Sequence, residues 1–368
     1  MFVYHYVSFS KNGNSAKYND QDVFMSQLKY VISRIRRLNI RRMLSKAAEI
    51  RNKTGRPRLF ILMDMVWCGF RYQAGYMDYA LFEMYNMNHR QRSTVLTRGK
   101  NNRYVAALNN KNGWPFFENK INFLKTFSNY IGRRWIDLST CSPEAFMEFV
   151  NELGRFIAKP YNGTHGDGVE LIAAPPADDP GAFADLYERL KSDGLTLCEE
   201  VITQHDDLNA IYNGSVNTIR AVSIVSRGEA HVVAACLRIG NGGKIVDNFN
   251  NGGMVVPIDV NNGQINLPAV DKAGNVYETH PVSGTSIIGA RIPFWQDCLS
   301  LIKAAAQVIP IVRYVGWDIA VTPAGPIIVE GNQFPGHDIY GLPPHAPDKI
   351  GILPAFEAVV PLKSLNRI

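Results

Sequence analysis

The stretch GWDIAVTPAGPIIVEGN, residues 316–332, has the pattern of two β-strands joined by a tight turn. Pro323-Ala324-Gly325 suits a three-residue hairpin loop, because proline favours the start of a type I turn and glycine favours the left-handed residue that ends it. This loop predicts that Thr322 pairs with Pro326 across the hairpin. A bulge beside the turn would shift the pairing by one residue and move every side chain to the other face.

In that register the hairpin places two acids opposite each other. Asp318 faces Glu330, and Asn332 lies on the same face because side chains alternate along a strand. Two opposed carboxylates repel, and their neighbours along the strands are apolar, so a divalent cation would resolve the conflict. An all-oxygen ligand set suits Mg²⁺. The alternative is that nearby Arg or Lys side chains pair with the two acids.

A second motif is a glycine-rich loop between two strand-like segments, FIAKPYNGTHGDGVEL at 156–171. Its glycines, Gly163, Gly166 and Gly168, would let backbone N–H groups converge on a phosphate, and Lys159 would add a positive charge. The common GxxxxGK[ST] pattern is missing, and the chain returns to a strand, so we expect a flap that covers its ligand. The alternative is a glycine-rich hairpin without a ligand.

Composition indicates a globular protein. With 368 residues and 46% apolar content, the chain can bury a large core in two or three subdomains. No apolar run reaches the roughly 18 residues of a membrane span, and no signal-peptide pattern occurs, so we expect a cytoplasmic protein. Its five cysteines are widely spaced and form no CxxC, which predicts reduced thiols and neither a disulfide framework nor a thiolate zinc site.

The positive charge is concentrated near the N-terminus. Residues 29–58 hold eleven Lys or Arg against one acid, and apolar residues recur among them at helical spacing. This pattern predicts one or two amphipathic helices with basic outer faces. A solvated face is the simplest interpretation, and the alternative is peripheral contact with a polyanionic substrate or an anionic membrane surface. The chain has no RNA-reading or zinc-finger motif, which argues against nucleic acid as a partner.

From about residue 116, strand-like and helical stretches alternate, which is typical of an α+β protein. Five segments there resemble the ATP-grasp superfamily of carboxylate ligases, in order: ENKINFLK, AKPYNGTHGDGV, CEEVI, GWDIAV and VEGNQFPG. The further segments VNTIR, DNFNNGG, HPVSG and IPFW look closest to the sugar-transfer-associated ATP-grasp group, which is related to α-L-glutamate ligases. The resemblance implies two α+β subdomains that clasp ATP, at 116–200 and 201–368, after a mostly helical region at 1–115 that matches no standard preceding domain.

The resemblance also implies ATP and Mg²⁺ as cofactors and a role for particular residues. The expected nucleotide contacts are Lys120, Lys159, Gly163, Gly166 and Gly168 for the phosphates, Glu199 or Glu200 with the backbone near Val201 for adenine, and Asp207, or alternatively His205 or Asp206, for ribose. The expected metal ligands are Asp318, Glu330 and Asn332. Arg238, followed by Asn248 and Gly252-Gly253, is the candidate for the transferring phosphate or the acyl-phosphate oxygens. Arg220 is a candidate for the phosphates, and the alternative is that it pairs with a structural acid. His280 and His337-Asp338 are candidates for the acceptor pocket or for proton removal, and the alternative for each histidine is a satisfied structural residue.

The activity implied is that of a carboxylate–amine ligase that forms an amide through an acyl phosphate. Its substrates would be a small-molecule, glycan or peptide carboxylate and an amine, and the group's name suggests cell-surface polysaccharide or peptide biosynthesis. Two alternatives remain, a kinase of a sugar or alcohol on the same fold and a non-catalytic nucleotide-binding adaptor.

Overall fold

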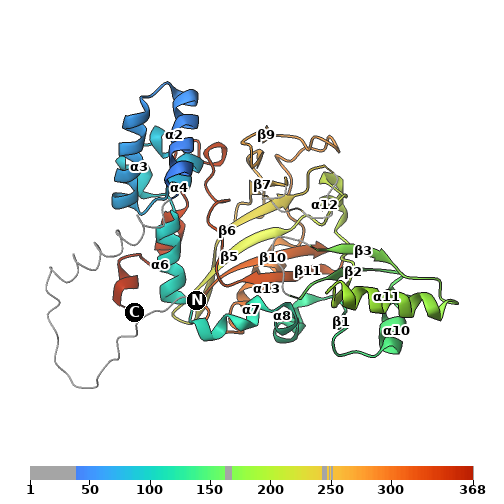
Figure 1. Cartoon of the computed structure of the whole chain (residues 1–368). Helices are drawn as coiled ribbons and strands as arrows, with labels where there is room; N and C mark the ends of the chain where they lie inside the picture. Colours follow the sequence, from blue (N-terminus) through green and yellow to red (C-terminus); the bar gives the residue numbers. More distant parts are fainter. Residues whose placement is uncertain (1–38, 162–167, 243–246, 248, 250–251, 368) are drawn as a thin grey trace, which may run out of the picture.

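The computed structural model describes residues 39–161, 168–242, 247, 249 and 252–367, which form an α+β fold with two antiparallel sheets. The smaller sheet has the strand order β1-β4-β2-β3, and the larger has the order β11-β10-β5-β6-β7-β8-β9 (Figure 1). The strands are β1 (Trp135–Asp137), β2 (Arg155–Lys159), β3 (Glu170–Ala173), β4 (Leu197–Glu200), β5 (Ile219–Ser226), β6 (Glu229–Ile239), β7 (Met254–Pro257), β8 (Ala269–Asp271), β9 (Val276–Tyr277), β10 (Tyr314–Thr322) and β11 (Gly325–Asn332).

Helices in the described residues form an N-terminal group and the layers that cover the sheets. They are α2 (Ile40–Thr54), α3 (Arg58–Tyr72), α4 (Tyr76–Leu81), α5 (His89–Ser93), α6 (Arg98–Leu108), α7 (Pro115–Glu118), α8 (Lys120–Thr126), α9 (Ser128–Ile131), α10 (Pro143–Leu153), α11 (Pro180–Ser192), α12 (Asp206–Ile211), α13 (Trp295–Ala305) and α14 (Leu353–Val359), with 3-10 turns η1 (Met84–Asn86), η2 (Lys111–Gly113), η4 (Pro343–His345) and η5 (Ser364–Arg367). Among these described helices, none has the length and apolar content that a membrane crossing requires.

The amphipathic helices predicted in the basic segment are present as α2 and the start of α3. The side chain of Asn39 caps α2 by accepting from the backbone N–H of Arg42 at 3.0 Å, and Gly55 ends it at a φ of +72° that favours glycine. The part of the predicted segment at 29–38 lies outside the described residues. The N-terminal helices bury a core of their own, to which Ala47 and Met65 belong.

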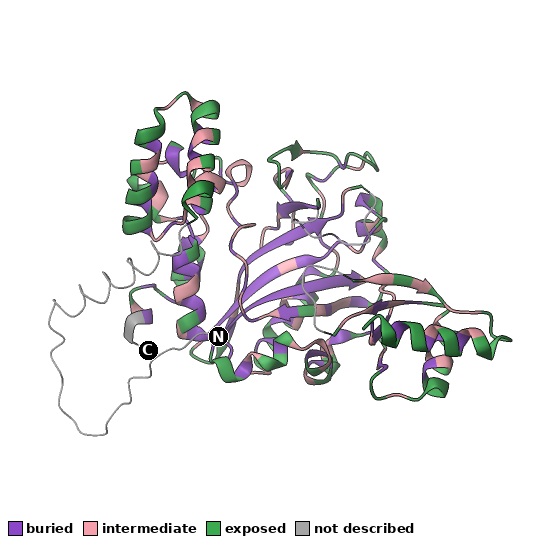
Figure 2. Ribbon diagram, viewed as in Figure 1, coloured by how far each residue is buried: buried purple, intermediate pink, exposed green. Residues whose placement is uncertain are grey.

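The large sheet is covered on both faces, and Figure 2 shows its strands buried along most of their length. One face, which carries Trp317 and Ile319, packs on the helices α7, α8 and α13. The opposite face, which carries Tyr314, packs on α6 and α14. Since side chains alternate along a strand, Asp318 lies on the Tyr314 face, at a point beyond the apolar cluster that α6 and α14 cover.

The small sheet has one helix-covered face and one face turned the other way. Phe156 and Ala158 of β2 pack on the core that α10 and α11 close. Alternation therefore turns Lys159 to the opposite face. The strands that flank the predicted phosphate loop pair antiparallel, with Ala158 opposite Glu170, so the predicted return to a strand is confirmed.

The hairpin of β10 and β11 corrects one prediction and confirms another. Thr322 pairs with Gly325, so the predicted three-residue loop is wrong and the turn holds only Pro323 and Ala324. The Thr322 hydroxyl tightens this turn by donating to the Gly325 carbonyl at 2.8 Å. Ile319 faces Ile328 while Asp318 faces Glu330, so Val329 is an extra residue that forms a bulge in β11. The bulge shifts the pairing by one residue, back to the predicted register. The predicted opposition of the two acids is therefore confirmed.

Gly331, which follows Glu330, lies against aromatic rings. A Cβ built at this position would be 2.9 Å from the ring of Phe123 and 3.0 Å from the ring of Phe117, closer than carbon atoms normally approach. Phe127 and Trp317 pack on the same rings. Glycine is therefore required at Gly331 by close packing, and its missing side chain lets α7 and α8 approach the sheet.

We expect Gly331→Ala to lower the free energy of unfolding by about 1–3 kcal/mol, because the added methyl group overpacks this aromatic cluster. Urea denaturation followed by tryptophan fluorescence measures the change. Gly181→Ala, in the first turn of α11, is the matched control, because its Cβ would have only an ordinary contact at 3.4 Å. Equal stability of Gly331→Ala and Gly181→Ala would contradict the packing argument.

Candidate functional site

Charged residues from both sheets and from α8 gather in one cluster. Lys120 is close enough to three other charged groups for each to act on its pKa. Burial lowers this pKa most and the positive charge of Lys159 lowers it further, whereas the negative charges of Glu330 and Glu199 raise it by less. These groups come from α8, β2, β11 and β4. The fold therefore brings together side chains that are more than two hundred residues apart in the sequence, such as Lys120 and Glu330.

Asp318 lies at the centre of the large sheet's part of this cluster. Its Oδ2 atom lies 3.0 Å from Nη2 of Arg220 and 2.9 Å from Nη2 of Arg238. Burial alone would raise the pKa of Asp318, but the two guanidinium charges outweigh burial and hold it below its ordinary value. For Asp318 the alternative of pairing with nearby arginines is thus confirmed, because Arg220 sits directly opposite it on the neighbouring strand β5.

Glu330 is in a different electrostatic state from Asp318. Its side chain reaches solvent, whereas Asp318 is 2% exposed. Loss of hydration among the surrounding residues raises the pKa of Glu330, and the negative charge of Asp318 raises it further. Arg220 and Arg238 lower it, but by less. Of the two opposed acids, Asp318 is therefore the one that the two arginines hold, and Glu330 is the one whose carboxyl group remains open to a new partner.

Arg238 is held by a second acid that the sequence analysis missed. Its Nη2 atom lies 2.6 Å from the hydroxyl of Thr218 and 3.5 Å from Asp247, and Asp247 also accepts from the backbone N–H of Thr218 at 2.8 Å. Burial lowers the pKa of Arg238, but Asp247, Asp318 and Glu330 together raise it above its ordinary value. The available signal for Asp247 was its position directly before Asn248, which itself lies outside the described residues.

Arg133 joins the two sheets, and no sequence signal pointed to it. It forms an ion pair with Glu199 of β4 at 3.3 Å, and it donates to the carbonyl oxygens of Ile328 at 2.8 Å and Val329 at 3.0 Å, at the bulge of β11. Lys159 donates to the same Glu199 at 2.7 Å. Burial would raise the pKa of Glu199, but the two cations lower it to about 2.

The expected nucleotide contacts lie on α8, at the end of β4, on α12 and in the glycine loop. Lys120 donates to the carbonyl of Pro160 at 2.9 Å, next to the glycine loop. Glu200 accepts from the backbone N–H of Arg134 at 3.0 Å, and Val201 follows directly after β4. Asp207 is exposed in the first turn of α12. In the loop, Gly168 has a φ of +73°, which favours glycine, whereas Gly163 and Gly166 lie outside the described residues.

The two candidate histidines are engaged in structural contacts. His280 is fully buried, with Nε2 2.8 Å from the carbonyl of Gly240 and Nδ1 accepting from the backbone N–H of Val282 at 3.2 Å. Its ring stacks on Tyr212. His337 is buried with Nε2 2.8 Å from Asp78 of α4. Both nitrogens of His280 are therefore occupied, which leaves it no position from which to take a substrate proton.

Oxygen atoms for a metal ion are available on β11. Among the described residues, no group of three His, Cys, Asp or Glu side chains is arranged to hold a metal. Glu330 and Asn332 lie two positions apart on one strand and share a face, and Asn332 Oδ1 accepts from the backbone N–H of Phe334 at 2.8 Å. Such a set fits Mg²⁺ that is bound mainly through phosphates and water, since Mg²⁺ usually takes only one or two protein carboxylates.

The opposed pKa shifts predict opposite effects of two neutralising substitutions on stability. Asp318→Asn leaves Arg220 and Arg238 without their common anion, so we expect it to lower the free energy of unfolding by on the order of 3 kcal/mol at pH 7. Glu330→Gln removes a carboxylate that is unfavourable when charged, so we expect it to raise the melting temperature at pH 8.

The pH dependence gives the control for this pair. A raised pKa means that wild-type stability falls as pH rises from the ordinary glutamate range through the folded pKa of Glu330, so the advantage of Glu330→Gln should shrink toward pH 4. The contribution of Asp318 is present above its unfolded pKa and is lost as pH falls through its lower folded pKa. Melting temperatures from pH 4 to pH 8 measure the change for Glu330→Gln, while the deficit of Asp318→Asn should stay nearly constant because this range lies above the pKa of Asp318. A shift of the same sign for both variants at pH 8 would refute the assignment.

Comparison with known proteins assigns the family. The chain matches the family described as sugar-transfer associated ATP-grasp over residues 99–346, which is more than half of its length. No curated protein sequence matches it. Solved structures with a similar fold include the ATP-grasp ligase PsnB complexed with the precursor peptide PsnA2 and AMPPNP, which is 19% identical with a TM-score of 0.41 over 76% of this chain and 70% of that chain. Another is D-alanyl-alanine synthetase A from Vibrio cholerae O1 biovar eltor str. N16961, which is 12% identical with a TM-score of 0.40 over 69% of this chain and 66% of that chain. The family match confirms the resemblance noted in the sequence, and the chain belongs to the sugar-transfer associated ATP-grasp family.

Proposed function

We propose that the cluster between the two sheets binds ATP with Mg²⁺ and that the protein is a ligase that joins a carboxylate to an amine. The observation that carries this proposal is the set of three cations, Lys120, Arg220 and Arg238, that lie close enough to act on the solvent-accessible carboxyl group of Glu330, with a fourth cation, Lys159, beside Lys120. Cations that come from both sheets suit an extended polyanion such as a triphosphate.

The cations divide by position into two groups. Lys120 and Lys159 lie beside the glycine loop, so they are proposed to hold the phosphates that stay with the nucleotide. Arg220 and Arg238 lie on the large sheet, where they are proposed to hold the transferring phosphate by charge-assisted hydrogen bonds. The adenine is proposed to bind along the backbone after Glu200 and Val201, and the ribose near Asp207.

Glu330 and Asn332 are proposed to hold Mg²⁺, which supplies charge neutralisation for phosphoryl transfer when bound. Asp318 remains in the proposed ligand set, but its oxygens already serve Arg220 and Arg238. Because Glu330 must lose its proton to bind a cation and its pKa is raised, affinity for Mg²⁺ is proposed to increase as pH rises through that pKa.

The chemistry proposed has two steps. An oxygen of the substrate carboxylate bonds to the γ-phosphorus while the bond to ADP breaks, which gives an acyl phosphate. The nitrogen of a neutral amine then bonds to the acyl carbon while the bond from that carbon to the phosphate oxygen breaks. Phosphate leaves, the proton that the nitrogen gives up leaves with it, and an amide remains. The protein's contribution is to position both substrates and to neutralise charge, which requires no protein nucleophile. Because both nitrogens of His280 are occupied, we assign it no role in removing the proton of the amine. A glycan or peptide is the proposed substrate class, in cell-surface polysaccharide or peptide biosynthesis, in keeping with the family's description.

We expect the nonhydrolysable analogue AMPPNP to raise the melting temperature of the protein, and to raise it further when Mg²⁺ is added. Lys159→Met should remove the effect of the nucleotide, because it deletes a phosphate contact. Glu330→Gln should keep the effect of the nucleotide and lose the increment from Mg²⁺. Glu188→Gln, which neutralises an exposed acid on α11, is the control and should behave as wild type. An Mg²⁺ increment that survives in Glu330→Gln would exclude Glu330 as a ligand.

Trapping by hydroxylamine tests the reaction itself. The protein is incubated with ATP, Mg²⁺, hydroxylamine and a panel of amino acids and uronic acids, and we expect a hydroxamate and ADP with at least one acid. Glu330→Gln should reduce this product at least about a hundredfold, since it removes charge stabilisation of the transfer. A stable phosphorylated product without any hydroxamate would instead identify a kinase, and an absence of ATP turnover with every acid would favour a nucleotide-binding adaptor.

A further inference from the structure

Helix α3 has an apolar face that no other described part of the chain covers. Its inner face packs into the core of the N-terminal helices through buried residues such as Ile61 and Met65. The residues that recur on the other side are large and apolar, and between 48% and 68% of each is exposed: Leu59, Phe60, Met63, Val66, Trp67 and Phe70. Contiguous exposed apolar surface of this kind marks an interaction site.

The charge around this face is strongly positive. Residues 39–72 contain eight Lys or Arg and two acids. Both acids are already neutralised, since Asp64 accepts two hydrogen bonds of 2.7 Å from Arg92, and Glu49 pairs with Lys46 at 2.5 Å. On α2 and α3, exposed basic residues remain at Arg41, Arg42, Arg51, Arg58 and Arg71. The helices α2 and α3 therefore carry five exposed arginines besides the apolar face of α3.

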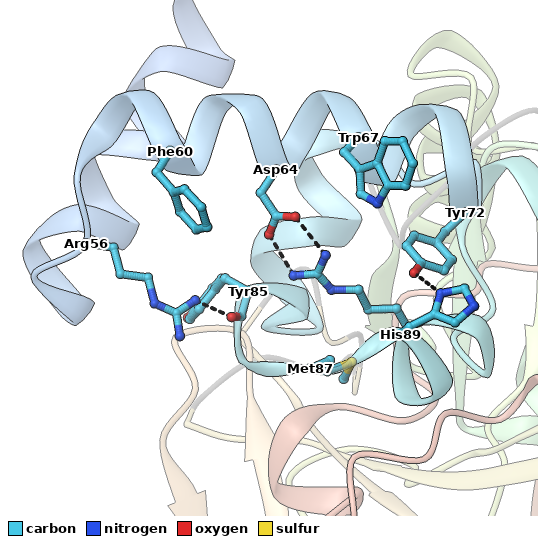
Figure 3. Close-up of a pocket in the computed structure, with 9 residues that line it drawn as sticks. Arg56, Phe60, Asp64, Trp67, Tyr72, Tyr85, Met87 and His89 are labelled. Carbon is cyan, nitrogen blue, oxygen red and sulfur yellow. Dashed lines mark hydrogen bonds and ion pairs between the residues drawn. The ribbon is translucent and has the colours of Figure 1, made fainter.

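An open groove continues the apolar face on one side of α3. It has a volume of about 570 Å³, with Phe60 and Trp67 on its wall and Tyr85 and Met87 on the opposite side (Figure 3). Arg56 also lines it, and its guanidinium group is held by the backbone of Tyr85 and by Asn86. Aromatic walls beside arginines can accept an acyl segment together with its anionic headgroup.

The position of α3 leaves the proposed catalytic cluster open. Figure 1 shows α2, α3 and α4 at one end of the molecule and the small sheet with α10 and α11 at the other, with the large sheet between them. A flat surface could therefore contact α3 without covering the region between the sheets.

We propose that the outer face of α3 docks on the surface of a bilayer that contains anionic phospholipids. The apolar side chains enter the boundary between headgroups and acyl chains, where Trp and Phe are favoured, and the exposed arginines contact lipid phosphates. A partner protein could bind the apolar face of α3 without the exposed arginines. An anionic bilayer matches both the apolar face and the arginines. This inference is independent of the proposed ligase activity.

Cosedimentation of the full chain with vesicles tests the proposal. We expect binding to vesicles of phosphatidylcholine with about 30 mol% phosphatidylglycerol, much weaker binding to phosphatidylcholine alone, and a decline of binding with salt. The double variant Trp67→Ser/Phe70→Ser should lose at least about tenfold in partition coefficient, and Arg41→Glu/Arg51→Glu should lose the preference for anionic lipid. Leu171→Ser/Val282→Ser, which removes exposed apolar side chains elsewhere, is the matched control and should bind as wild type.

Tryptophan fluorescence gives a second measurement that does not depend on a destabilising change. Trp67 is 58% exposed, so its emission should shift to the blue on adding anionic vesicles, and Trp67→Phe should lose the shift while it still binds. Without vesicles, acrylamide should quench Trp67 freely; if it is protected, this face is covered by another part of the chain and the proposal fails. The proposal also fails if the wild-type protein is a dimer, Trp67→Ser/Phe70→Ser is a monomer, and neither protein binds vesicles. Retained ATP turnover in the double variant would show that the fold and the catalytic cluster are intact.

Discussion

The bulge at Val329 is the local feature on which the arrangement of the site depends. The tight turn at Pro323-Ala324 sets a register in which Glu330 would fall on the apolar face of the sheet, with Trp317. One extra residue in β11 reverses this and turns Glu330 toward Asp318. The bulge leaves carbonyl oxygens outside the regular ladder, and Arg133 satisfies them while it also holds Glu199 of the small sheet. A single buried side chain thus stabilises the bulge and links the two sheets.

The electrostatics of the cluster follow from that arrangement. Asp318 pairs with two arginines, which hold its pKa below the ordinary value. Its negative charge helps to raise the pKa of the opposed Glu330, whose side chain is exposed to solvent. Such a carboxyl group lowers the stability of the protein at neutral pH, and residues of this kind are concentrated at functional sites. The cluster contains more positive than negative side chains, which suits an anionic ligand that brings its own cation.

The N-terminal helices are attached to the ATP-grasp core by buried polar contacts. Tyr314 of β10 donates to Asn101 of α6 at 2.6 Å, and Asn101 donates to the carbonyl of Pro335, just after β11, at 3.0 Å. His337 pairs with Asp78 of α4 in the same region. Helix α6 therefore packs as part of the large sheet's cover even though it precedes the α+β segment in the sequence.

Local pattern in the sequence determined the longer strands, the main helices and the α+β class, because alternation, helical spacing and Gly-Pro turns depend on neighbouring residues. The short strands β1, β7, β8 and β9 were not predicted. The local pattern also placed Asp318 opposite Glu330, although by a loop one residue too long, an error that the bulge at Val329 offset. Only the tertiary structure decided the partners of these acids. Arg220 lies 98 residues before Asp318, and Arg133 has no motif around it. The reason is physical: ion pairs and bulges depend on which strands become neighbours, and that is set by the packing of the whole sheet.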